Sequence, residues 1–309
     1  MTTQQSRPKI EVNQDTQADG HRKCKALVKR DFLKHRWFAR NFPREQQRAL
    51  YSLFGFVVQS MDYLDLESTD GLSLDVWCEF RDDLNNAFND EYVSEEFYVL
   101  IAAVRKYDLP RQYLFDMLNG ADHWIRNRKF ETYDDLLVFA YQMGGTPMAL
   151  SVPIAGFIKP GYEDAAIKAG QAVFLTNSIA NIVRDMKLNK CFIAKEDIEE
   201  LELDVSRVKV RKASPELKHL IRLYGSRIEK LMYEGGKLAN FLDFDARRSF
   251  VSLMAYHWRL LTKMRAQPES VLSDEGVLTR RERVGLKTRH LMGMEGSIPI
   301  IPEADDHHH

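Results

Sequence analysis

Residues 174–201 of the chain read FLTNSIANIVRDMKLNKCFIAKEDIEEL. Asn181, Asp185 and Asn189 recur in this stretch at intervals of four residues. On a helix that spacing advances each side chain by about 40° around the axis, so the pattern predicts three oxygen-bearing side chains along one face. Apolar residues surround these positions, which favours a largely buried helix: Ile179, Ile182, Val183 and Leu188.

Oxygen ligands on a buried helix suit a hard cation. Mg²⁺ binds carboxylate and amide oxygens, stays partly hydrated, and is commonly shared with the phosphate groups of a substrate. Arg184 and Lys187 are close in sequence and could bind those phosphates. We therefore predict that Asn181, Asp185 and Asn189 bind Mg²⁺ together with a phosphate ester. The alternative is a polar helix face with ordinary hydrogen bonds.

A second acidic stretch ends residues 48–67, which read RALYSLFGFVVQSMDYLDLE. Apolar residues recur here at helical spacing, so the pattern predicts another buried helix. Asp62 and Asp65 lie one turn apart near its end, and buried carboxylates are usually paired or bound to metal. Facing each other across an apolar cavity, the two helices would make an Mg²⁺ site for a diphosphate ester. In the alternative interpretation, Asp62 and Asp65 lie beyond the buried part and face solvent.

Composition narrows the class of protein. The 309 residues are 44% hydrophobic and 29% charged, yet the net charge is only −1, and no basic tract suggests a nucleic-acid partner. No run of about 18 apolar residues predicts a membrane span, and the polar first twenty residues predict no secretory signal. Cys24, Cys78 and Cys191 form no CxxC pair. A reduced, cytoplasmic protein is expected.

Helical patterns run through most of the chain, and no convincing strand pattern is present. The predicted helices are approximately 22–41, 44–66, 72–88, 92–107, 110–128, 132–157, 162–189, 214–241, 245–266 and 279–292. Gly144-Gly145-Thr146-Pro147 interrupts one of them, and such a break either exposes backbone groups to a ligand or only kinks the helix.

We expect one all-α domain with a central cavity. It covers residues 21–300, after a disordered N-terminus at 1–20. Residues 301–309 form a tail whose final Asp-Asp-His-His-His looks like a tag remnant and is left out of any metal argument.

Three segments resemble the squalene/phytoene synthase family, and the resemblance extends over nearly the whole chain. They are PREQQRALYSLFGF at 43–56, FDMLNGADHWIRNRKFETYDDLLVFAYQMGGTPMAL at 115–150 and ANIVRDMKLNKCFIAKEDI at 180–198. The resemblance implies an all-helical isoprenoid synthase fold with a deep apolar pocket and metal ligands at its mouth. It also implies Mg²⁺-dependent chemistry on prenyl diphosphates, in which the allylic C–O bond breaks and the carbocation is captured.

The chain departs from the family in its first motif, which is Asp-x-x-x-Asp preceded by an arginine. Met61 stands at the first Asp and Val58 at the arginine, whereas Asp65 keeps the second Asp and Asp62 is a neighbouring candidate. In the second motif Asn189 replaces the closing Asp.

Asn181, Arg184 and Asp185 match the second motif. Near the C-terminus the family carries an arginine pair, where this chain has Asp274 and Glu275. An acid in place of a diphosphate-binding arginine would repel the ligand.

All of these substitutions remove positively charged or metal-binding positions. Head-to-head coupling needs two allylic diphosphates in one cavity, so the substitutions disfavour it. The chain keeps one coherent ligand face, from which we infer one diphosphate site. Some bacterial proteins that resemble the family prenylate aromatic acceptors such as carbazoles. The sequence thus predicts transfer of one prenyl group, for example from dimethylallyl diphosphate, to an aromatic small molecule, with Asp185 and Arg184 as catalytic residues. Asp62 and Lys187 are expected to bind substrate, and the candidate wall residues, each of which could equally be plain core, are Tyr51, Phe54, Tyr141 and Met148.

Two alternatives stay open at this stage. One is a head-to-head prenyl synthase or a single-substrate terpene cyclase. The other is a non-catalytic assembly protein of the same fold, which would be expected to lose both ligand faces.

Overall fold

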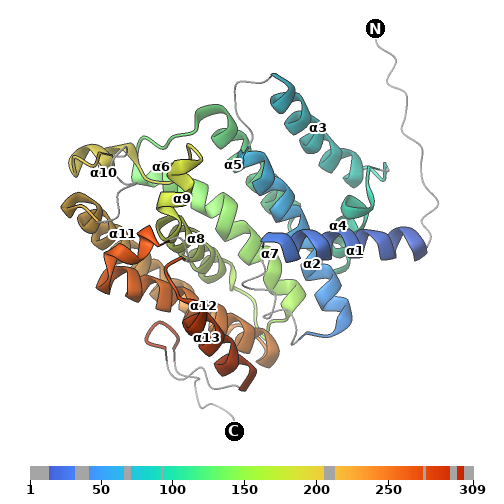
Figure 1. Ribbon diagram of the computed structural model, residues 1–309. Helices are drawn as coiled ribbons and strands as arrows, with labels where there is room; N and C mark the ends of the chain where they lie inside the picture. The colour runs from blue at the N-terminus through green and yellow to red at the C-terminus, as the bar shows by residue number, and fades with distance from the viewer. Residues whose placement is uncertain are drawn as a thin grey trace. The chain divides into compact units, whose positions relative to one another are not determined.

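The computed structural model describes residues 14–31, 42–65, 71–91, 93–204, 213–273, 276–292 and 298–302 (Figure 1). These residues are almost all helical. Within them the only β-type pairings are two isolated bridges, Phe130 with Ala194 and Phe157 with Leu242. The expected all-α fold class is therefore confirmed.

The chain divides into two compact units, and the first comprises the described residues within Met1–Arg126 together with Pro153–Ala155. Its helices are α1 (Gln14–Asp31), α2 (Arg44–Asp62), the 3₁₀ turn η2 (Tyr63–Asp65), α3 (Gly71–Phe88), α4 (Glu95–Lys106) and α5 (Arg111–Asn127).

Helix α2 is the core of the first unit and packs against α1 and α4. Its buried face repeats at helical spacing, with Leu50, Leu53 and Val57 at most 4% exposed. Gly55 lets α1 approach closely, because a Cβ atom there would lie 3.0 Å from the Cβ of Cys24. Trp124 of α5 donates a hydrogen bond to the carbonyl oxygen of Leu64 at 3.2 Å, which fixes the turn after α2.

The second unit comprises the described residues within Asn127–Val152 and Gly156–His309. Its helices are α6 (Tyr133–Ala140), the π-helical turn η3 (Tyr141–Gly145), α7 (Thr146–Ala155), α8 (Glu163–Ala180), α9 (Ile182–Lys187), α10 (Lys195–Glu200), α11 (Pro215–Gly236), η5 (Lys237–Asn240), α12 (Phe244–Ala266), η6 (Pro268–Leu272) and α13 (Arg280–Met292).

Helix α8 is the centre of the second unit and lies beside α11, η3 and α12 (Figure 1). Two glycine contacts allow this close packing. A Cβ atom on Gly144 of η3 would lie 2.4 Å from the carbonyl oxygen of Gly170, and one on Gly235 of α11 would lie 2.4 Å from the amide nitrogen of Ala169. The glycine break predicted at residues 144–147 thus becomes a π-helical turn that packs backbone to backbone on α8.

Several predicted helix limits were wrong. Helix α1 begins at Gln14, so residues 14–20 of the expected disordered segment are helical, while residues 1–13 lie outside the described part. Residues 132–157 form two helices joined by η3, and residues 162–189 form α8 and α9 with a break at Asn181. Helix α10 was not predicted, because its six residues are too few to show a period.

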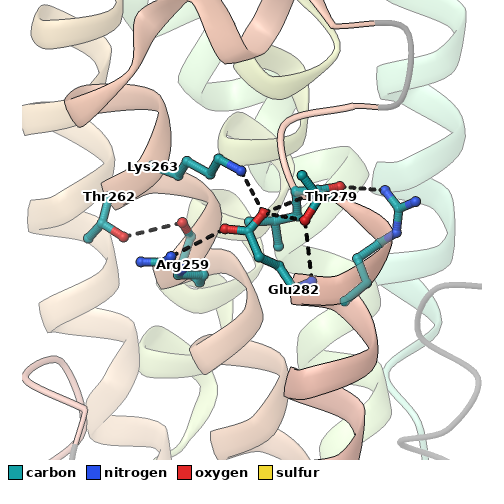
Figure 2. Close-up of polar contacts among 7 residues, drawn as sticks. Arg259, Thr262, Lys263, Thr279 and Glu282 are labelled. Carbon is teal, nitrogen blue, oxygen red and sulfur yellow. Dashed lines mark hydrogen bonds and ion pairs between the residues drawn. The ribbon is translucent and has the colours of Figure 1, made fainter.

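Glu282 ties the start of α13 to α12 (Figure 2). Its carboxylate accepts hydrogen bonds from Lys263 Nζ at 2.5 Å, Arg259 at 3.2 Å and both the backbone amide and the hydroxyl of Thr279 at 2.9 Å. The hydrogen bond from Lys263, opposed by partial desolvation and aided by Thr279, lowers the pKa of Glu282 from 4.5 to about 2.

This pKa predicts a pH-dependent contribution to stability. A carboxyl whose pKa falls on folding stabilises the fold fully above its unfolded pKa of 4.5, and the contribution disappears as the pH falls towards 2. Glu282→Gln should therefore lower the midpoint of urea unfolding by a similar amount at about pH 7 and pH 5, and by less at about pH 3.5. A difference between wild type and variant that is constant down to pH 3.5 would exclude this assignment.

Candidate functional site

The motif of residues 181–189 begins where α8 ends. Asn181 has φ −107° and ψ 9°, outside ideal helical geometry, and separates α8 from α9. The hydrogen-bond ladder nevertheless continues across the break: the Asn181 amide donates to Asn177 O and the Asp185 amide donates to Asn181 O, each at 2.9 Å. Asn177, Asn181 and Asp185 consequently lie on successive helical turns.

Asp185 is the buried carboxylate of this face, with a side chain that is 10% exposed. Burial raises its pKa from 3.8 to about 6, an effect that the charge of Arg184 opposes. The contact with Arg184 is loose, since the guanidinium nitrogens lie 3.3 and 3.4 Å from Oδ1 and the arginine side chain is 69% exposed. One exposed neighbour therefore compensates the buried charge only partly, and a cation would compensate it further.

Asn189 does not continue the helical face, contrary to the expectation from its spacing. Its φ is 54°, in the left-handed region, and its side chain is exposed. The Lys190 amide donates to Asp185 O at 2.8 Å and the Asn189 amide donates to Met186 O at 3.2 Å, which is the pair of bonds of a Schellman motif. Asn189 is thus the residue that ends α9, and asparagine suits that conformation second only to glycine. Its role in metal binding stays a prediction.

The basic side chains that follow Asn181 are available to a ligand. Arg184 and Lys187 are both exposed on α9. They lie on the same short helix as Asp185, so an anion bound near that carboxylate would meet positive charge.

A buried histidine supports the turn before the motif. It contacts Asn177 from 80 positions away, too far along the chain for spacing to predict the contact. His257 of α12 is fully buried, and its Nδ1 lies 2.8 Å from the carbonyl oxygen of Leu253. Its Nε2 lies 3.4 Å from Nδ2 of the half-buried Asn177. The Asn181 Nδ2 in turn donates to the carbonyl oxygen of Asn177 at 2.8 Å.

Three phenylalanine rings flank the motif and contact one another, and none was among the predicted wall residues. Phe174 of α8 meets Phe139 edge-on at a centroid distance of 5.5 Å and Phe192 at 5.7 Å. Phe139 and Phe192 stack at 5.8 Å with an interplanar angle of 12°. Aromatic spacing in α6 and α8 alone could not single them out, because the same pattern is typical of ordinary core.

The four predicted wall residues are all partly exposed. Tyr51 and Phe54 lie on α2 in the first unit, and Lys25 Nζ lies 5.7 Å from the Tyr51 ring centroid. Tyr141 begins η3 and Met148 lies on α7, both in the second unit. Their role in substrate binding stays a prediction.

Val58 and Met61, which replace the arginine and the first Asp of the family's first motif, are apolar residues on α2. Val58 is 1% exposed, and Met61 is partly exposed. Asp62 next to it is exposed and accepts two hydrogen bonds from Arg30 Nη2 of α1, at 2.7 and 2.6 Å. Asp62 therefore faces solvent, as the alternative interpretation of the acidic stretch expected. Asp65 lies in η2, but its side chain is outside the described part of the structure.

Asp62→Ala separates two roles for this carboxylate. As half of an exposed ion pair with Arg30, it should contribute less than about 1 kcal/mol to stability, and its loss should leave donor affinity unchanged. As a support of the diphosphate site, its loss should weaken donor binding. We expect Asp62→Ala to shift the unfolding midpoint only slightly and to raise the KM for the donor, with Arg30→Ala as the matched control. Wild-type KM in Asp62→Ala would remove Asp62 from the site.

Asp197 of α10, in the segment that follows the motif, is the centre of a buried hydrogen-bond network with α11. The residue is 1% exposed and accepts hydrogen bonds from the Tyr224 hydroxyl at 2.8 Å and from Arg227 Nη1 and Nη2 at 2.7 and 3.0 Å. The Tyr224 hydroxyl also accepts from the Ala194 amide at 3.0 Å. Arg227 lies 4.0 Å from the Tyr133 ring centroid. This network attaches α10 and residue 194 to α11.

The residues present fit Mg²⁺ bound together with a diphosphate. Asp185 supplies one under-compensated buried carboxylate, and Asn181 supplies an amide on the preceding turn. No group of three or more His, Cys, Asp or Glu side chains suited to a metal occurs among the residues that the structure describes. Such a sparse donor set suits Mg²⁺, which typically takes one or two carboxylates and completes its shell with water and phosphate oxygens.

Comparison with known proteins identifies the family to which the protein belongs. The sequence model of the Squalene/phytoene synthase family matches residues 35–284, and the chain belongs to this family. It is 23% identical to a phytoene synthase of Thermus thermophilus over 243 residues, which cover 78% of this chain and 82% of the relative. A 15-cis-phytoene synthase of Paracoccus sp. is 26% identical over 104 residues, 34% of each chain.

Solved structures show the same fold. A dehydrosqualene synthase in complex with a ligand matches with a TM-score of 0.79 and 17% identity, over 91% of this chain and 98% of the other. A squalene synthase of Alicyclobacillus acidocaldarius matches with a TM-score of 0.73 and 18% identity, over 83% and 96%. The expected isoprenoid synthase fold is confirmed. In the described portion of the chain, no helix has the length and apolar character needed to cross a bilayer.

Proposed function

We propose that the protein transfers one prenyl group from an allylic diphosphate, such as dimethylallyl diphosphate, to an aromatic small molecule such as a carbazole, with Mg²⁺ and with release of pyrophosphate. The observation that carries the proposal is an asymmetry between the two motif helices. The second keeps a buried Asp185 and exposed basic neighbours, whereas the first has Val58 and Met61 at its arginine and Asp positions. One such ligand face supports binding of one diphosphate rather than two.

The residues of the second motif have separable roles in this reaction. Asp185 and Asn181 would hold Mg²⁺, which when bound draws negative charge off the diphosphate leaving group. Arg184 and Lys187 would pair with its remaining oxygens. The allylic C–O bond breaks and its electron pair leaves with pyrophosphate. A C–C bond then forms between the allylic carbon and a ring carbon of the acceptor, whose proton leaves to a base.

The aromatic cluster of Phe139, Phe174 and Phe192 would stabilise the allylic cation that forms when the C–O bond breaks. Aromatic faces attract cations, by about 0.5–2 kcal/mol each depending on desolvation, without acting as nucleophiles that would trap them. Apolar walls also exclude water, which would otherwise quench the allylic cation before the acceptor attacks.

The second candidate is head-to-head coupling of two prenyl diphosphates, and the identity of the relatives favours it. The relatives in sequence include phytoene synthases of Thermus thermophilus and Paracoccus sp., and the structural neighbours include a squalene and a dehydrosqualene synthase. This activity would need a second diphosphate to be held without the Asp that Met61 replaces.

Pyrophosphate release separates the candidates. The purified protein is incubated with Mg²⁺ and allylic diphosphates of five to twenty carbons, with and without a panel of electron-rich aromatic acceptors. We expect release that depends on an acceptor. Equal release from the donor alone would favour the synthase or a cyclase, and no release under any condition would favour a non-catalytic protein.

A further inference from the structure

Asn177 occupies the turn before the predicted ligands, at the same four-residue interval. The carbonyl oxygens of Asn177 and Asn181 accept from the amides four residues later, so Asn177, Asn181 and Asp185 follow one another along one ridge. Asn189, the third member expected from the sequence, has instead left the helix with φ 54°. The ridge of oxygen-bearing side chains therefore extends towards the N-terminus of α8, not towards residue 189.

His257 determines which way the Asn177 amide is turned. A carbonyl oxygen can only accept, so the 2.8 Å contact with Leu253 O requires a proton on His257 Nδ1. His257 is fully buried, which disfavours a charged ring, and in the neutral ring with its proton on Nδ1 the Nε2 atom carries a lone pair. The group opposite Nε2 must then be a donor, which assigns the NH₂ of Asn177 to the histidine side. Because the amide is planar, its carbonyl oxygen is directed away from His257.

We propose that Asn177 is an oxygen ligand of the Mg²⁺–diphosphate site and that His257 is the positioning residue that presents its amide oxygen to that site. The inference rests on the proposed function, because it extends the same ligand face. Asn177 is half-buried, so part of the residue is open to a ligand, whereas His257 is fully buried and would act through Asn177. Asn177 of α8 lies against the histidine ring, and the variants below remove its 3.4 Å contact with Nε2.

Binding of Mg²⁺ with inorganic pyrophosphate tests the proposal without relying on turnover. Isothermal titration calorimetry is done on wild type, Asn177→Leu, His257→Leu and the double variant. Loss of a ligand or of its orienting partner typically weakens metal affinity by roughly 10–100-fold, so each single variant should show that loss. If His257 acts through Asn177, the double variant should bind no more weakly than Asn177→Leu.

Two further variants keep the result interpretable. Thr176→Val removes a buried hydroxyl that bonds only within α8, to Ala172 O at 2.6 Å, and should bind like wild type. His257→Gln retains an acceptor for the Asn177 amide and should recover part of the affinity; it also replaces His257→Leu if that protein does not fold. The midpoint of thermal unfolding without ligand, measured for each variant, monitors folding.

Each outcome decides one point. Wild-type affinity in Asn177→Leu overturns the inference and leaves the proposed function standing. Additive losses in the double variant overturn the role of His257 as an orienting partner. Failure of wild type to bind Mg²⁺ and pyrophosphate at all removes the proposed diphosphate site, and the inference with it.

Discussion

Replacing Asp185 by alanine should reduce turnover by roughly 10²–10³-fold, the loss expected when a site loses a main stabiliser of developing charge. The side chain is 10% exposed and is the single buried carboxylate that the structure describes on the 181–189 motif. Its removal leaves only the amide oxygens of Asn181 and, by the inference above, Asn177 on the adjoining turns. The measurement is kcat with an allylic diphosphate and acceptor, together with helical circular dichroism, which should not change.

Stability distinguishes this role from a structural one. Burial disfavours the charged form of Asp185, as its pKa of about 6 indicates, so Asp185→Ala should not lower the unfolding midpoint. If the contact with Arg184 were structural, Asp185→Ala and Arg184→Ala would both destabilise the protein. Asp164→Ala, an exposed carboxylate in the first turn of α8, is the matched control. Turnover by Asp185→Ala, or by wild type in excess EDTA, would contradict a metal-binding role.

The largest loss of stability is expected from Asp197→Ala. The change leaves the guanidinium of Arg227 and the hydroxyl of Tyr224 without their shared acceptor in a site where Asp197 is 1% exposed. Removing one partner of a buried ion pair typically costs about 3–5 kcal/mol. Urea or thermal unfolding of purified variants measures the shift.

An exposed ion pair close to Asp197 provides the control. Glu131 and Lys195 pair at 3.1 Å, and both side chains are 51% exposed. Glu131→Ala should therefore shift the unfolding midpoint far less than Asp197→Ala does, because exposed ion pairs contribute little to stability. If Asp197→Ala shifted stability no more than Glu131→Ala does, the buried network would not be what holds α10 to α11.

The helical architecture could be predicted because periodicity is a local property. The buried face of α2 and the long pattern of α8 appear directly in the order of apolar residues. Interruptions were harder to place. The π-turn η3 depends on Gly170, which is 26 positions after Gly144 and admits its backbone. Residue 189 left the helix because a Schellman motif ends α9, and that motif depends on backbone geometry rather than on side-chain period.

The candidate site could be proposed from the sequence only where its residues lie close together in the chain. Asn181, Arg184 and Asp185 are contiguous enough to be recognised from sequence, and the buried state of Asp185 agrees with the apolar residues around it. The partners that determine roles come from distant segments. Arg30 pairs with Asp62 from 32 positions away, and His257 meets Asn177 across 80 positions. No spacing rule connects such residues, so the environment of Asp62 and the candidacy of Asn177 needed the structure.

Mass spectrometry of the products tests the central claim most directly. The purified protein with Mg²⁺ is given allylic diphosphates of five to twenty carbons, each with a panel of aromatic acceptors including carbazoles, and no NADPH. The proposed activity predicts an acceptor whose mass increases by one prenyl group less one hydrogen, with pyrophosphate formed in equal amount. Conversion of farnesyl or geranylgeranyl diphosphate alone into a C30 or C40 hydrocarbon would contradict the one-donor account and establish head-to-head coupling.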